Sequence, residues 1–287
     1  MADELKTHGW AYLNIGNPMC AWATYRGALV SIPTSPGFLS VWSASVLHHA
    51  SAERIAREHA LEWCRATFYP NRVSRLIGMF CFTELRSAEK ALEWGSHFKL
   101  QNLAELSLAE VRRGDRLDSN WITYGDFDDP SRGACFGYWS GMPYPGAEPV
   151  WETILEGRLD VLGTDIRERA YARIEKHMPD STPLAELGRI AAWVGSNLGA
   201  VYAFLRADGD YVELEYIMDM QEANDPAFIK KISDLLSSGH PMRQEASRAF
   251  AEDRVRAPDL RPFGFRKPKS ELPFVGLQQA GPHPANR

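Results

Sequence analysis

The sequence predicts an α+β protein, and three stretches carry this prediction. Two apolar runs with polar flanks, Leu76–Thr83 and Trp151–Leu155, are typical of buried strands. The longer stretch Ser43–Ala66 instead repeats apolar residues at helical spacing and is rich in alanine. With 287 residues, the chain is long enough to bury a substantial core.

The sequence also predicts three regions. Residues 1–165 mix strand and helix patterns and are expected to form the main domain. Residues 166–256 are more charged and predict a mainly helical annex. Residues 257–287 are dominated by Pro, Gly, Gln and Arg, which predicts a poorly ordered tail or one draped on the surface.

The other expected elements follow from local signals. Short apolar segments broken by Gly and Pro predict further strands. These are Trp10–Ile15, Gly27–Ile32, Glu105–Val111, Leu159–Leu162 after a turn at Gly157-Arg158, and a hairpin of Tyr202–Leu205 with Tyr211–Met218.

Helical patterns and start signals such as Thr182-Pro183 and Asp225-Pro226 predict helices. These are Ser87–Trp94, Asp165–Lys176, Thr182 to about Leu198, Asp225 to about Gly239, and Met242–Val255. Asp115–Gly133 is rich in Asp, Gly and Ser and predicts a long loop.

Composition narrows the function classes. The net charge of −5 argues against attraction of nucleic acid over the whole surface, although a local basic patch is compatible with it. No run approaches the 18 to 20 or so apolar residues that span a bilayer, so no membrane partner is expected. The aromatic content of 11% is high, and either core packing or a pocket for a flat ring accounts for it.

The cysteines and the first residues predict the compartment. Cys20, Cys64, Cys81 and Cys135 form no C-x-x-C pair and no zinc-like cluster with histidine, so reduced thiols and no metal are expected. The segment Met1–Lys6 is polar and acidic, unlike a secretory signal. A cytoplasmic protein is therefore expected.

Two segments about seventy residues apart carry a family resemblance. The first is Asn71–Thr83, which continues into Ser87–Trp94. The second is Tyr138-Trp139-Ser140-Gly141, followed by Glu148–Leu162. In this order they resemble a bacterial family catalogued as a domain of unknown function and grouped with the ADP-ribosyltransferase-like fold. The resemblance covers roughly residues 12–162.

This resemblance implies a split sheet with a cleft for NAD and an NAD-dependent ADP-ribosyltransferase activity. ADP-ribose would pass from NAD to an unidentified acceptor, a protein or a nucleic acid, as in bacterial toxins, effectors and defence proteins. The transition state of this reaction is oxocarbenium-like. A carboxylate that binds the ribose 2′-hydroxyl stabilises the developing positive charge.

The resemblance assigns that carboxylate to Glu152, the first residue of Glu-Thr-Ile-Leu-Glu-Gly. Glu148 and Glu156 are rivals, the first expected in a loop and the second beside a turn. The alternative for Glu152 itself is an exposed strand residue without a catalytic role.

The same resemblance implies the NAD-binding residues. Arg72, Ser74 and Arg75 precede the first apolar strand, and arginine suits a pyrophosphate because its planar fork binds in a bidentate way. The alternative is a solvated turn. Tyr138 and Trp139 are expected to wall a ring pocket, and the alternative for Trp139 is core packing.

One departure from the family concerns the first strand. The family begins with a Tyr-His-Val-like strand, whereas this chain has Tyr12-Leu13-Asn14-Ile15. Asn14 is therefore assigned to the position that holds NAD. The missing histidine also favours an alternative, a catalytically inactive scaffold.

A second alternative is a nucleic-acid-binding module that uses the basic tail. Arginines and lysines near the C-terminus alternate with two phenylalanines, a pattern suited to single-strand contacts. The residues are Arg254, Arg256, Arg261, Phe263, Phe265, Arg266, Lys267 and Lys269.

Overall fold

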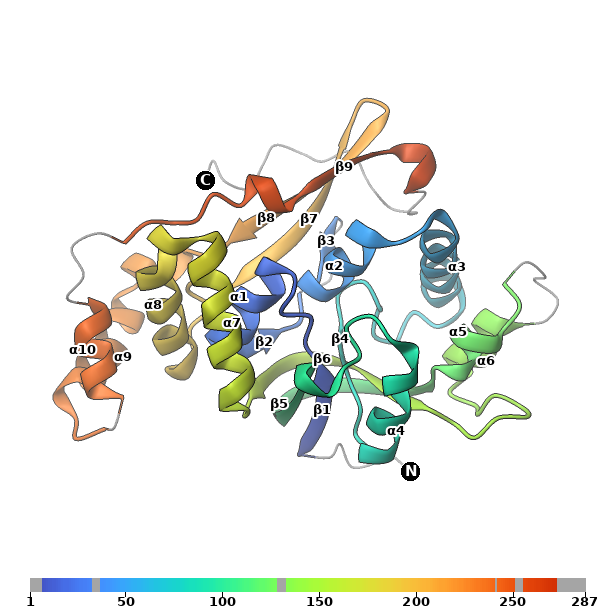
Figure 1. The fold of residues 1–287 in the computed structure, drawn as a ribbon, viewed down its shortest axis with the longest axis horizontal. Coiled ribbons are helices and arrows are strands. Elements are labelled where there is room, and N and C mark those ends of the chain that lie inside the picture. Colours follow the sequence, from blue (N-terminus) through green and yellow to red (C-terminus); the bar gives the residue numbers. More distant parts are fainter. Residues whose placement is uncertain (1–6, 33–36, 128–132, 241, 251–254, 273–287) are drawn as a thin grey trace.

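A computed structural model describes residues 7–32, 37–127, 133–240, 242–250 and 255–272. Within these residues the chain forms two antiparallel sheets with helices packed around them (Figure 1). The predicted α+β class is confirmed.

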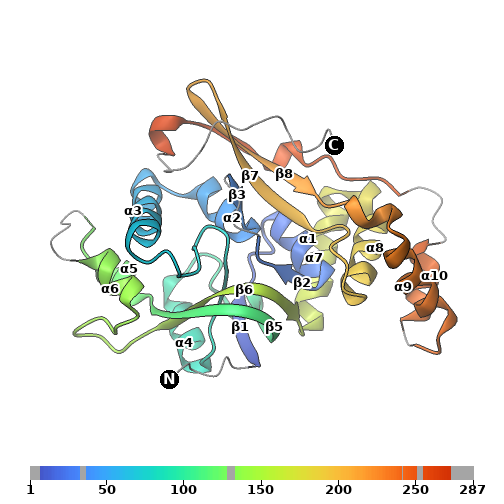
Figure 2. The same cartoon turned by 180° about the vertical axis from the view of Figure 1, so that it is seen from behind.

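The first sheet has the order β1-β5-β6-β2, and β4 also pairs with β6. Its strands are β1 (His8–Tyr12), β2 (Ala28–Val30), β4 (Met79–Cys81), β5 (Leu103–Asp118) and β6 (Trp151–Val161). The long strands β5 and β6 cross the lower half of the molecule side by side (Figure 2). β4 pairs with the first half of β6 and β2 with its second half, so the two apolar runs predicted as strands are direct neighbours.

Two predictions for this sheet are wrong. The expected turn at Gly157-Arg158 lies inside the continuous strand β6, where Gly157 pairs with Val111 beside an irregularity in β5. The loop expected over Asp115–Gly133 is wrong in its first part, because β5 runs through Asp118 and α5 (Asn120–Tyr124) follows. Both segments are extended because a partner strand covers them, and that partner lies more than thirty residues away in the sequence.

The second sheet has the order β3-β7-β8-β9. Its strands are β3 (Phe38–Leu39), β7 (Val201–Asp208), β8 (Tyr211–Met218) and β9 (Phe265–Pro268). The β7–β8 pair confirms the predicted hairpin around Asp208-Gly209-Asp210. β9 belongs to the predicted tail, so this part of the tail is ordered through pairing with β8. Residues 273–287 lie outside the described residues.

The helices follow the predicted ones with some differences. They are α1 (Pro18–Arg26), α2 (Val41–His49), α3 (Ala52–Phe68), α4 (Leu85–Lys90), α5 (Asn120–Tyr124), α6 (Ala134–Ser140), α7 (Thr164–His177), α8 (Thr182–Trp193), α9 (Pro226–Ser237) and α10 (Arg243–Phe250). The helix expected over Ser43–Ala66 is two helices, because Ser51 caps α3 through its side chain. The unpredicted α1 begins at Asn17, whose side chain accepts hydrogen bonds from two backbone amides.

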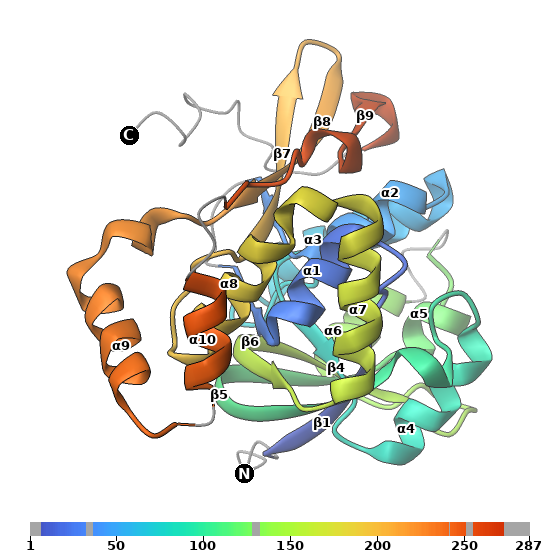
Figure 3. The same cartoon turned by 60° about the vertical axis from the view of Figure 1, so that its left-hand side comes forward.

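The core joins the predicted main domain to the predicted annex. α1 packs against α7 and α8, which lie beside it in Figure 3. Trp22 on α1 is buried, and its indole Nε1 donates to the carbonyl of Gly199 at 2.8 Å. The largest buried cluster contains residues from Ala11 to Leu272, so both predicted parts contribute to one core.

Candidate functional site

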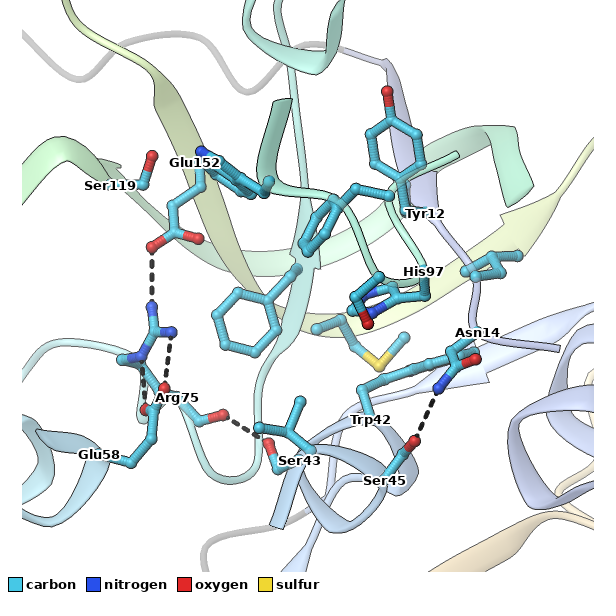
Figure 4. Close-up of a pocket in the computed structure, with 18 of the residues that line it drawn as sticks. Tyr12, Asn14, Trp42, Ser43, Ser45, Glu58, Arg75, His97, Ser119 and Glu152 are labelled. Carbon is cyan, nitrogen blue, oxygen red and sulfur yellow. Dashed lines mark hydrogen bonds and ion pairs between the residues drawn. The ribbon is translucent and has the colours of Figure 1, made fainter. Parts of the chain in front are cut away.

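A pocket of about 480 Å³ lies where the start of β6, the segment before β4 and helices α2 and α3 meet (Figure 4). Aromatic side chains from several elements line it, namely Tyr12, Trp42, Phe80, Phe82, Trp94 and Phe98. Ligand pockets in proteins are typically about 300–1,000 Å³ and combine apolar walls with a few polar groups. The pocket has the size and lining of a site for a small molecule with a flat ring.

Glu152 provides the carboxylate of this pocket. It is the second residue of β6 and shares a face with Ile154, which is buried in a cluster with Tyr138 and Leu61. Its Oε1 accepts hydrogen bonds from Arg75 Nη1 at 2.7 Å and from the Tyr138 hydroxyl at 2.6 Å. Figure 4 shows the second carboxylate oxygen directed towards the pocket. One oxygen is thus fixed by the protein, and the other is available to a ligand.

Arg75 connects Glu152 to a second buried carboxylate, that of Glu58 on α3. Its Nε lies 2.9 Å from Glu58 Oε2, and its Nη2 lies 3.2 Å from Glu58 Oε1. The guanidinium also lies 4.8 Å from the ring centroid of Phe80. Because Arg75 serves both carboxylates, its hydrogen-bonding capacity is largely used within the protein.

The pKa shifts follow from this arrangement. Burial alone would lower the pKa of Arg75, but Glu58, Tyr138 and Glu152 outweigh it and hold that pKa well above its usual value. Burial alone would raise the pKa of Glu58, yet Arg75 and Arg54 keep it below its usual value. Both groups are therefore charged at neutral pH. Burial raises the pKa of Tyr138 well above its usual value, so its hydroxyl stays protonated and donates to Glu152.

A close backbone approach places Arg75 beside Glu152. The turn before β4 closes through a hydrogen bond from the Gly78 amide to the Ser74 carbonyl at 2.9 Å. A Cβ atom at Gly78 would lie 2.5 Å from Ile154 on β6, so a side chain there would push the turn away from the strand. Glycine at this position therefore allows Arg75 to reach Glu152.

The rival carboxylates lie elsewhere. Glu148 is half exposed and forms ion pairs with Arg86 at 2.5 Å and Lys90 at 2.6 Å. Glu156 pairs with Arg113 at 2.6 Å and does not line the pocket. Of the three glutamates considered from the sequence, Glu152 is the one that lines the pocket.

The predicted NAD-binding residues fall into two groups. Asn14 and Arg75 line the pocket together with Glu152, and Asn14 Nδ2 donates to the Ser45 hydroxyl at 3.0 Å. Tyr138 does not line the pocket but holds the carboxylate of Glu152.

The other three predicted residues have contacts away from the pocket. Arg72 pairs with Asp115 at 2.7 Å, and the Ser74 hydroxyl donates to Glu62 at 2.9 Å. Trp139 is fully buried, and its Nε1 donates to the Leu61 carbonyl at 2.8 Å. This placement corresponds to the core-packing alternative for Trp139.

Sequence reasoning missed Glu58 and much of the aromatic wall. Glu58 occupies a buried position of α3, whose other buried residues are Ile55, Leu61 and Cys64. A glutamate at regular helical spacing among apolar residues was the available signal. His97 was also missed, and it lies across the pocket from Glu152 in Figure 4.

Several described cations of the tail make contacts within the protein. Arg266 pairs with Asp208 at 2.9 Å, Arg261 with Asp259 at 2.8 Å, and Lys267 Nζ donates to the Leu47 carbonyl. The two phenylalanines of the tail pack against the core. Arg254 lies outside the described residues.

In the described ranges, no group of three or more His, Cys, Asp or Glu side chains is arranged to hold a metal ion. The four cysteines are free thiols. No described helix combines the length and the apolar character needed to cross a membrane.

Comparison with known families gives a match over the centre of the chain. Residues 39–169 match a family described as protein of unknown function (DUF2441). The match includes Glu58, Arg75, Tyr138 and Glu152 and leaves out Asn14. No curated protein matches the chain. Over these residues, less than half of the chain, the protein is similar to a family of unknown function, as the two sequence segments indicated.

Proposed function

We propose that this protein is an NAD-dependent ADP-ribosyltransferase with an ADP-ribosyltransferase-like fold, which transfers ADP-ribose from NAD to a macromolecular acceptor, a protein or a nucleic acid. One observation carries the proposal. Glu152 directs one carboxylate oxygen towards an aromatic pocket, while Arg75 and Tyr138 fix its other oxygen.

Each part of the pocket has a role in this reaction. The aromatic walls suit the flat nicotinamide ring. The free oxygen of Glu152 accepts a hydrogen bond from the ribose 2′-hydroxyl. As the bond between the ribose carbon and the nicotinamide nitrogen breaks, its electron pair leaves with nicotinamide and positive charge grows on the ribose. The negative charge of Glu152 stabilises that state. The acceptor then bonds to the ribose carbon and releases its proton.

Arg75 and Tyr138 act as positioning residues in this proposal. They orient Glu152 before substrate arrives, so little reorganisation is needed as charge develops. Arg75 is bound to Glu58 and Glu152, so in this proposal it positions Glu152 and does not bind the pyrophosphate of NAD. Asn14 remains assigned to cofactor binding, because it lines the pocket on the side opposite Glu152.

The test compares nicotinamide release by the wild type, Glu152→Gln and Glu156→Gln. Glu152→Gln keeps the size of the side chain and removes its charge, so turnover should fall about 100-fold or more while NAD affinity changes little. Glu156→Gln removes a charge from the same strand outside the pocket and should retain turnover. Equal turnover in both variants would contradict the role of Glu152.

Nicotinamide release and the salt dependence of nucleic-acid binding separate this proposal from its alternatives. An inactive scaffold gives no nicotinamide release in the wild type, whether or not NAD binds. For a nucleic-acid-binding module, affinity for single-stranded nucleic acid would fall steeply as salt is added. The ion pairs of Arg261 and Arg266 leave both side chains largely exposed, so the salt dependence decides for or against this module.

A further inference from the structure

A second hollow, of about 610 Å³, adjoins the aromatic pocket beyond the end of β1. Asn14, Ser96 and His97 line both cavities, so the two are direct neighbours. In Figure 4, Asn14 and His97 lie on the side of the aromatic pocket opposite Glu152. A ligand longer than one ring can therefore extend from Glu152 into this second hollow.

The second hollow has a basic lining made by Lys99, Arg169 and Arg173. Arg169 and Arg173 are four residues apart on α7, so they lie on one face of the helix. The lining contains no carboxylate from the described residues. Within that same part of the chain, none of the three cations forms an ion pair.

Backbone carbonyls hold the two arginines in place without neutralising them. Arg173 Nη2 donates to the Gly16 carbonyl at 3.0 Å, and Arg169 Nη2 donates to the Gln101 carbonyl. The Nε of Arg173 is buried and has no hydrogen-bond partner. A buried donor without a partner is unfavourable, and an anion in the hollow would supply the acceptor it lacks.

We propose that this hollow binds the phosphate groups of the ligand whose ring occupies the aromatic pocket. Guanidinium groups suit phosphate oxygens because they stay charged and offer two donors in a plane. If the proposed function is right, the ligand is NAD and the bound group is its diphosphate. The inference rests on the proposed function for that identity, while the preference for phosphate rests on the three cations alone.

The test measures binding of ADP-ribose and of inorganic pyrophosphate by calorimetry. The variants are Arg173→Gln, the double variant Arg169→Gln/Arg173→Gln, and the control Lys176→Gln. Lys176 is an exposed residue of the same helix outside the hollow, so its change removes the same charge without touching the site. Lys99→Gln provides a second route if the arginine variants fail to fold.

ADP-ribose affinity should fall about tenfold or more in Arg173→Gln and further in the double variant, since a hydrogen bond to a charged group is lost each time. The control should stay within about twofold. Wild-type affinity should also fall with added salt. Unchanged ADP-ribose affinity in the double variant would overturn the inference.

The proposed function and this inference can fail separately. If NAD neither binds nor is cleaved, but pyrophosphate binds and Arg173→Gln weakens it, the phosphate site stands and the proposed function is wrong. If NAD is cleaved and its affinity is the same in the double variant, the phosphate site is wrong and the proposed function stands.

Discussion

The guanidinium of Arg75 lies between two buried carboxylates and bonds to both. Glu58 and Glu152 are each less than a tenth exposed, so each would be unfavourable as an isolated charge. Arg75 compensates both, and Arg54 adds a second positive charge at 2.8 Å from Glu58. At the residue scale, the pocket carboxylate is therefore part of a balanced buried network.

This network predicts that Arg75→Met destabilises the protein strongly. The change leaves Glu58 and Glu152 buried with reduced compensation, and the free energy of unfolding should fall by about 3–5 kcal/mol. Arg113→Met is the control, because Arg113 is half exposed and its pair with Glu156 lies at the surface, where a loss of about 0–1 kcal/mol is expected. Urea unfolding measures the loss of unfolding free energy in both variants. Similar losses in the two variants would contradict a structural role for Arg75.

His97 predicts a dependence of stability on pH. Burial and the nearby charge of Arg54 lower the pKa of His97 below its ordinary value of 6.5. As the pH falls below 6.5, the unfolded chain binds a proton that the folded protein resists, so folding stability decreases. Above that pH, both states are neutral at this residue and the effect vanishes.

Urea unfolding at pH 7.5 and pH 5.5 measures this effect. The wild type should be less stable at pH 5.5, and His97→Gln should reduce the difference between the two pH values. The other histidines whose pKa is lowered, His48, His59 and His177, account for what remains. An unchanged difference in His97→Gln would show that His97 does not contribute.

Residue types predicted the pocket only in part. Glu152 and Asn14 line the pocket. Arg75, which was expected to bind the pyrophosphate, is instead bound to Glu58, a residue that was not predicted to belong to the site. An arginine before a strand looks the same whether its partner is a ligand or a buried glutamate. The partner is decided by tertiary packing, which brings α3 against the segment before β4.

At the scale of elements, β6 determines the geometry of the site. Its first half carries Glu152 and pairs with β4, and its second half pairs with β2. Gly157 lies between these halves with φ of 138°. The sequence indicated a turn here, because Gly-Arg between two apolar runs fits a hairpin as well as an irregular strand. Only the partner strand β5 distinguishes the two.

Gly157→Ala should therefore destabilise the sheet. A Cβ atom at this position would lie 2.5 Å from the Glu110 carbonyl oxygen, and the positive φ is unfavourable for alanine. We expect a loss of about 1–3 kcal/mol in the free energy of unfolding, measured with urea. Gly239→Ala is the control, since no atom lies within 4 Å of its added Cβ and its φ is not positive. A loss no larger than in the control would contradict this account of β6.

At the scale of the whole molecule, the predicted regions share one core. Arg26 on α1 donates to the carbonyls of Leu198 and Ser196, which follow α8. The sequence suggested a boundary near residue 165 because composition changes there. The largest buried cluster crosses that boundary, while α8, α9 and α10 form a smaller buried cluster of their own, so composition alone does not reveal the packing.

The tail extends this shared core, and its removal gives the last prediction. β9 pairs with the edge of β8, and Leu272 is 1% exposed within the main cluster. A chain ending at Arg256 loses both features, together with the contacts of Phe263 and Phe265. The burial of Leu272 alone contributes about 1.5–3 kcal/mol, and the bared edge of β8 offers unpaired backbone groups to other chains.

Urea unfolding and light scattering compare this chain with one that ends at Leu272, which keeps every described contact of β9. The chain ending at Arg256 should lose at least about 3 kcal/mol of unfolding free energy, since two phenylalanines are lost with Leu272. It should also self-associate more readily. Equal stability and equal scattering would mean that the tail is not part of the folded core. If the stability falls as expected while nicotinamide release by the remaining folded protein persists, the tail supports the fold and takes no part in the reaction.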